Sequence, residues 1–251
     1  MTFLDSLSRF ATWTDADLGK TWTYRERTTN LRYALYRSIE EEQEAVATAL
    51  SAPQNEASRI ISLAQAAFGD LRGLLAGVPE ALLDRTPAEG EWSLRATLHH
   101  VLSTERAYRA QTRYAVERSE SDPTLFPQER RPETAPAEVA GTIAAIVALF
   151  DRERAETDRF VRTMTDASLE LMTVWAGFTV NSRFRLHRVA AHFTEHTIQC
   201  ETTIERLGLA QADAPRIVRE LSRMRGLHER TTGGGALAAL DATLAARAAL
   251  A

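Results

Sequence analysis

The sequence predicts an all-α protein whose core is an antiparallel four-helix bundle with a long middle crossover. Apolar residues recur at i, i+3, i+4 spacing along several segments of helical length. Glycine and proline separate these segments, and none of them shows the strict alternation and hairpin turns that a sheet would need. With 251 residues, 44% of them hydrophobic and 25% charged, the chain can bury a large core.

The first two bundle helices are expected to begin at residues that cap helix N-termini. Asn55 opens a helix that continues to Leu75, and Ser93 opens a second that continues towards Arg118. Three prolines among charged residues at 119–133 indicate that the chain then crosses over in a loop. This long crossover separates the two halves of the bundle.

The third and fourth helices follow the crossover. Thr134 is expected to open the third helix, with Pro136 in its first turn, where a missing N–H has no cost. Residues 169–179 are expected to be a linker. Asn181 or Ser182 then starts the fourth helix, which runs to Leu207 and Gly208.

The segments on either side of the bundle are expected to be extensions. Residues 1–27 predict a short helix and a packed loop, and a helix follows from Thr28 to Leu50 with its glutamates Glu40, Glu41, Glu42 and Glu44 as a solvated face. Residues 51–54 form a break. A short helix over 215–227 and an alanine-rich tail, loosely docked or frayed, end the chain. The expected division is therefore 1–54, 55–210 and 211–251.

Charge and composition exclude several classes of function. The formal net charge of −4, with both signs interspersed, predicts no nucleic-acid partner. No apolar run approaches the roughly 20 residues that span a bilayer, and the N-terminus is too polar for a signal peptide. The single cysteine, Cys200, cannot form an internal disulfide. We therefore expect a cytoplasmic protein without a membrane anchor.

Three histidines are candidate ligands of one divalent metal ion. His192 and His196 are spaced i, i+4, so both leave one face of the fourth helix about one turn apart. Both lie on a shoulder of the apolar stripe. In the second helix His100 lies on such a shoulder, whereas His99 is expected to face solvent. On spacing alone, such a pair is more often a surface or half-buried pair than a metal site.

Two sequence motifs resemble those of the DinB-like superfamily, which includes the YfiT-like metal-dependent hydrolases. Residues 91–100 resemble its W-S-x-x-x-x-x-x-H signature, and residues 185–199 resemble its H-x-x-x-H-x-x-Q helix. The resemblance covers residues 55–210. It implies a four-helix bundle with a metal triad at His100, His192 and His196, and it implies nothing about the remaining residues.

Other residues near these motifs are weaker candidates. Glu105 either orients a ligand histidine or forms a salt bridge to an arginine of a neighbouring helix. Gln199 either contacts a ligand or lies on the helix surface. Trp175 and Arg185 are expected to line a pocket at the open end of the site. Alternatively, Trp175 only fills the end of the bundle. Three further residues are expected to be structural and not functional: Cys200, His187 and His228.

The leading hypothesis is a metal-dependent enzyme that acts on a small molecule. The resemblance implies thiol transfer, with a low-molecular-weight thiol such as mycothiol or bacillithiol, or hydrolysis. Imidazole ligands suit zinc, nickel, iron and copper alike. The alternative is a non-catalytic binding module with a structural or vestigial metal site, in which the N-terminal helix forms a homodimer.

Overall fold

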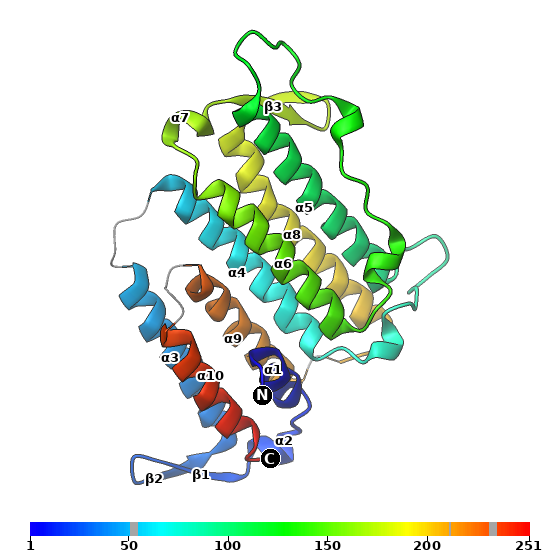
Figure 1. Ribbon diagram of the computed structural model, residues 1–251. Helices are drawn as coiled ribbons and strands as arrows, with labels where there is room; N and C mark the ends of the chain where they lie inside the picture. Colours follow the sequence, from blue (N-terminus) through cyan, green and yellow to red (C-terminus); the bar gives the residue numbers. More distant parts are fainter. Residues whose placement is uncertain (51–54, 211, 231–234) are drawn as a thin grey trace.

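The computed structural model describes residues 1–50, 55–210, 212–230 and 235–251. It confirms the predicted all-α class and the four-helix bundle. Four long helices lie side by side in this bundle (Figure 1): α4 (Glu56–Ala76), α5 (Leu94–Glu117), α6 (Ile143–Val161) and α8 (Ser182–Arg206). Within the described residues, no helix is both long and apolar enough to cross a membrane.

The bundle core is centred on three phenylalanines from three different helices. Phe68 of α4, Phe150 of α6 and Phe193 of α8 are fully buried or nearly so, and their ring centroids lie 5.7–6.0 Å apart. Rings at these distances add attraction beyond the burial of their surface. This cluster fixes how α8, which carries two candidate ligands, packs against its neighbours.

The third bundle helix begins later than the sequence predicted. Pro136 starts a short 3-10 helix, η3 (Pro136–Val139), and α6 begins only at Ile143. The hydroxyl of Thr142 caps α6, and Arg95 of α5 donates to the backbone carbonyls of Val139 and Gly141. Because Arg95 binds these carbonyls, the chain is held in a break there. The connections also contain η1 (Glu80–Leu82) and η2 (Gln128–Arg130).

The segments before and after the bundle share a second hydrophobic core. Its fully buried members include Leu7, Phe10, Leu35, Val218 and Leu221. The division at 54 and 210 stays a prediction, but these two terminal segments pack against each other. Leu244 and Ala248 are buried in this core, so the alanine-rich tail is a docked helix. Its helices are α1 (Phe3–Ala11), α2 (Asp15–Leu18), α3 (Leu31–Leu50), α9 (Asp213–Glu229) and α10 (Gly235–Ala248).

Two β-hairpins correct the prediction that the chain contains no strands. One runs from the expected N-terminal loop into the first residues of the helix expected from Thr28, and the other, preceded by α7 (Asp166–Leu169), begins in the expected linker and ends at Asn181. Their two-residue turns have positive φ angles, at Arg25 and Glu26 in the first and at Ala176 and Gly177 in the second. Such turns usually contain Asn-Gly or Asp-Gly, which neither hairpin has. The strands are β1 (Thr21–Tyr24), β2 (Arg27–Asn30), β3 (Met172–Trp175) and β4 (Phe178–Asn181).

The two hairpins belong to an internal repeat that the sequence analysis missed. The order short helix, hairpin, long helix occurs twice, and each element of the second copy lies 151 positions after its counterpart in the first. The capping threonines Thr14 and Thr165 correspond, as do the asparagines Asn30 and Asn181 that end the hairpins. Helix α3 is therefore the counterpart of α8.

Helix α4 of the bundle packs against α9 of the terminal segments. These two helices are also counterparts of each other in the repeat. Ala57, Ile60 and Gly69 of α4 match Ala214, Ile217 and Gly226 of α9, always 157 positions apart. A Cβ on Gly69 would overlap the Ser222 carbonyl oxygen, and one on Gly226 would overlap that of Gln65, the counterpart of Ser222. Reciprocal contacts of this kind are those of a two-fold axis.

The predicted solvated face of α3 is partly buried. Glu42 is fully buried and accepts hydrogen bonds from Nε of Arg225 (2.6 Å) and Nδ1 of His228 (3.0 Å), both on α9. A buried carboxylate needs such partners to offset the loss of its hydration. The polar pattern alone could not reveal them, because α9 lies far away in the sequence. The predicted break at 51–54 falls outside the described residues.

Candidate metal centre

Two capped helices carry the candidate ligands. The Ser93 hydroxyl accepts from the backbone N–H of Ala96 at the start of α5 (3.2 Å). The Asn181 side-chain oxygen accepts from the N–H of Phe184 at the start of α8 (2.9 Å). Both caps satisfy backbone donors that a helix start leaves unpaired. Helices α5 and α8 pack against each other, which places their histidines at one seam.

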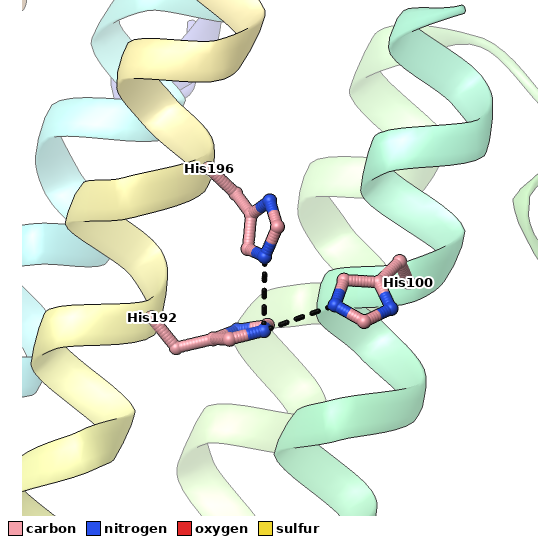
Figure 2. Close-up of side chains that lie close together, drawn as sticks. All are labelled: His100, His192 and His196. Carbon is pink, nitrogen blue, oxygen red and sulfur yellow. Dashed lines mark hydrogen bonds between the residues drawn. The ribbon is translucent and has the colours of Figure 1, made fainter. Parts of the chain in front are cut away.

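The three predicted ligands meet at this seam (Figure 2). His100 extends from α5, and His192 and His196 extend from α8. The Nε2 atom of His192 lies 3.2 Å from Nε2 of His100 and 3.0 Å from Nε2 of His196. One ring nitrogen of each residue lies within 4.8 Å of those of the other two. These residues form the histidine triad of the chain and could hold one metal ion.

The spacing of the triad fits the size of a common divalent ion. Zinc binds imidazole nitrogen at about 2.0–2.1 Å, so two nitrogens of a tetrahedral site lie roughly 3.4 Å apart. The two distances from Nε2 of His192 are slightly shorter than this, and a small outward movement of the rings would admit an ion. Three imidazoles also leave at least one coordination position for another ligand.

Burial favours the neutral form, which binds metals, in two of the triad histidines, His192 and His100. Burial, followed by the charges of His196 and His100, lowers the pKa of His192 to about 3. Burial also lowers the pKa of His100. Since a proton and a metal compete for the same nitrogen, imidazoles with low pKa values remain free for a metal at neutral pH.

Gln199 orients one of the triad histidines. The Nδ1–H of His196 donates to the Oε1 of Gln199 over 2.7 Å. This hydrogen bond fixes the proton on Nδ1 and leaves the lone pair on Nε2, which points at the triad. Neither role considered for Gln199, contact with a ligand or a plain surface position, included this hydrogen bond to a triad histidine.

His99 is not solvent-facing, which corrects the prediction. It is half-buried, and its Nε2 lies 2.8 Å from the backbone carbonyl oxygen of Thr134 in the crossover. The crossover covers the face of α5 that a helical wheel assigns to water. His99 points away from the triad and towards this carbonyl.

Glu105 forms the salt bridge that was one of its two expected roles. Its Oε1 accepts from Nη1 of Arg154 (2.7 Å) and from the hydroxyl of Thr157 (2.6 Å), and both partners lie on α6. Arg154 also donates to Asp158 over 2.8 Å. Glu105 thus belongs to a buried ionic network between α5 and α6.

A cavity of about 410 Å³ adjoins the triad and contains both expected pocket residues. The indole N–H of Trp175 donates to the hydroxyl of Tyr108 (3.3 Å), and the guanidinium of Arg185 lies 4.4 Å from the centre of the Tyr108 ring. Tyr108 was not among the candidate site residues. Its spacing from His100, eight residues along α5, could have placed it on the same face.

The other expected structural residues lie outside the triad. Cys200 is fully buried in the bundle core, and burial raises the pKa of its thiol to about 12. His187 is exposed on α8, and His228 is buried beside Glu42. Among the described residues, the cluster that could hold a metal consists of His100, His192 and His196, and it includes none of these three residues.

Comparison with known proteins agrees with the fold. The family model described as the DinB superfamily matches residues 63–200, more than half of the chain. The chain belongs to the DinB superfamily. A search of curated proteins finds no match.

A solved structure resembles the DinB-superfamily bundle of this chain. YfiT from Bacillus subtilis is described as a probable metal-dependent hydrolase with an unusual four-helix bundle topology. It aligns with a TM-score of 0.50 and 14% sequence identity, over 63% of this chain and 91% of YfiT. At 14% identity, the structural similarity to YfiT is evidence for the fold of this chain alone.

Proposed function

We propose that this DinB-superfamily chain is a metal-dependent enzyme that holds one divalent ion on His100, His192 and His196. The convergence of three Nε2 atoms at one helix seam carries the proposal. The description of YfiT as a probable metal-dependent hydrolase supports it. The ion would be zinc, nickel or iron, which imidazole ligands suit.

The residues around the triad are suited to such chemistry. A divalent ion on three neutral imidazoles keeps its full charge and, when bound, lowers the pKa of a water or thiol enough to supply a nucleophile near neutral pH. Gln199 holds His196 in the required tautomer. Tyr108 and Trp175 form a wall of the cavity in which a small molecule would bind.

The reaction class is hydrolysis or transfer to a low-molecular-weight thiol, in the cytoplasm. The cavity beside the triad favours this enzyme over the alternative, a binding module with a structural metal, because a closed structural site needs no adjoining cavity. In the alternative, the N-terminal helix would mediate a homodimer. That helix, α1, packs against α9 and α10 of its own chain.

Metal content of the protein purified without a histidine tag tests the proposal. We expect one divalent ion per chain by elemental analysis. His192→Ala and His100→Ala should each lower retention at least tenfold, since each removes one of three ligands.

His99→Ala provides the matched control, because His99 is adjacent to His100 but bonds to the Thr134 carbonyl. It should retain the metal. Loss of metal from His99→Ala with full retention by His100→Ala would refute the ligand set. A wild-type protein that binds no divalent ion would refute the function.

A further inference from the structure

The cavity next to the triad contains a buried arginine whose donors are incompletely used. Arg185 is 1% exposed, on the second turn of α8. Burial lowers its pKa to about 10, so it is still a cation at neutral pH. A buried cation usually has a carboxylate partner. Within the described residues, no ion pair to Arg185 is found.

The unused donors of Arg185 lie together on one edge of the guanidinium. Nε and Nη2 are both buried and have no hydrogen-bond partner among the described residues. These two N–H groups are parallel, and they form the edge that binds a carboxylate through two hydrogen bonds. Leaving such donors unpaired is costly, which points to a ligand group that completes them.

The surroundings of Arg185 favour an anion. Tyr108 stacks against its guanidinium, 4.4 Å from ring centre to Cζ, and holds it in place. Two more arginines, Arg188 and Arg131, line the same cavity, against a single carboxylate, that of Glu195. Glu195 lies 3.3 Å from Arg188, its ion-pair partner. Three arginines against one carboxylate give the cavity net positive charge without any contribution from the triad.

The internal repeat shows that the fold does not require an arginine at this position. In the first copy, Ala34 of α3 stands where Arg185 stands in α8, and it is also buried. Positions 41 and 45 of α3, the counterparts of His192 and His196, are Glu41 and Ala45. Capping and packing residues are shared between the copies, whereas Arg185, His192 and His196 occur in the second copy alone.

We propose that Arg185 binds the carboxylate of a small organic acid through its Nε and Nη2 edge, in the cavity beside the triad. Arg185 lies seven residues before His192, which is about 10 Å along the helix. The ligand therefore carries its carboxylate several atoms away from the group that reaches the triad. The part of this inference that concerns the group reaching the triad rests on the proposed metal function. The part that concerns the carboxylate does not.

A pair of matched thiols tests both ends of the ligand. Cobalt-loaded protein is titrated with mercaptohexanoate and with mercaptohexanol, each with a terminal thiol, and binding is followed by the thiolate-to-cobalt absorption. We expect mercaptohexanoate to bind about tenfold more tightly than the alcohol, the effect of a charge-assisted hydrogen-bonded pair. Arg185→Gln and Arg185→Lys should both lose this preference, because lysine keeps the charge but not the two-donor edge.

Arg206→Gln is the control on the same helix. Arg206 is exposed, pairs with Glu91, and does not line this cavity. It should keep the preference. Equal binding of the two thiols by wild type, or a preference that survives in Arg185→Gln, would overturn the carboxylate site and leave the metal function standing.

A measurement on metal-free wild-type protein separates the two proposals. The ¹⁵N resonance of Arg185 Nε is followed while butyrate or, as an uncharged control, butyramide is added. A shift that saturates with butyrate but not with butyramide supports the carboxylate site even if the protein binds no metal. No shift with either compound would overturn it, whatever the metal content.

Discussion

At the scale of single residues, the protonation of the triad makes stability depend on pH. The pKa of His192 is about 3 in the folded protein, whereas an unfolded chain has a value near 6.5. As pH falls below 6.5, the unfolded chain binds a proton that the folded chain does not. The stability present above pH 6.5 is therefore lost progressively down to about pH 3.

Metal-free protein should lose about 2 kcal/mol of stability through His192 between pH 7 and pH 5. Urea unfolding at the two pH values measures this loss. His192→Gln should show a smaller loss, and His187→Gln, which replaces an exposed histidine on the same helix, should behave like wild type. An equal loss in wild type and His192→Gln would contradict the low pKa.

The grouping of His100, His192 and His196 could be predicted from the sequence, but the surroundings could not. Helical spacing placed His192 and His196 on one face, and the wheel separated His100 from His99. The hydrogen bond of His99 to Thr134 and the pairing of Glu105 with Arg154 depend on how distant segments pack. Arg185 could be named as a pocket residue, but its unpaired edge could not.

At the scale of elements, the two asparagine caps at the ends of the hairpins allow a matched comparison. Asn181 accepts from the N–H of Phe184 at the start of α8, and Asn30 accepts from the N–H of Tyr33 at the start of α3. Asn181→Ala and Asn30→Ala should each cost about 1 kcal/mol of stability. Thermal unfolding measures both changes.

Neither cap variant should change the metal content, since His192 lies more than two turns inside α8. Asn181→Ser should restore most of the stability that Asn181→Ala loses, because serine also caps helices and, unlike aspartate, places no second carboxylate beside Glu170, to which Asn181 donates. Loss of metal in Asn181→Ala at unchanged stability would contradict this account, in which the cap acts on the helix end.

The helices were predictable because their apolar periodicity is long, and the hairpins were not. Each strand has four residues, too few for a clear alternation. Their turns place Arg25, Glu26 and Ala176 in the left-handed region, which non-glycine residues rarely adopt. The late start of α6 depends on Arg95, a residue of another helix.

At the scale of the whole molecule, the contact between α4 and α9 depends on glycine. Gly226→Ala should cost about 1–2 kcal/mol, because overpacking against the Gln65 backbone costs up to about 3 kcal/mol and the higher helix propensity of alanine returns about 1. Gly69→Ala should lower stability by a similar amount, because its Cβ would overlap the Ser222 carbonyl oxygen. Chemical denaturation measures both.

Gly19→Ala is the control for these variants. A Cβ there would lie 3.4 Å from the nearest atom, the Ala16 carbonyl oxygen, which is ordinary contact. It should leave stability within about 0.5 kcal/mol of wild type. Equal stability of Gly226→Ala and Gly19→Ala would contradict the close approach of the two helices.

The repeat was the largest feature that went unrecognised in the sequence. A direct comparison of the chain with itself would align Thr14-Asp15-Ala16 with Thr165-Asp166-Ala167, and Leu35 with Leu186. So few identical positions are weak evidence for a repeat unless the two hairpins are known. Helices α4 and α9 follow α3 and α8 in the same order but at an offset of 157 instead of 151, and an offset in the sequence does not show which helices pack together.

The contact of α4 with α9 joins two related halves that a peptide link already holds together. In a dimer of separate chains, such a contact weakens on dilution, since its occupancy depends on protomer concentration. Here the local concentration of one half around the other is set by the connecting chain. The melting temperature of this protein should therefore not change between nanomolar and micromolar solutions.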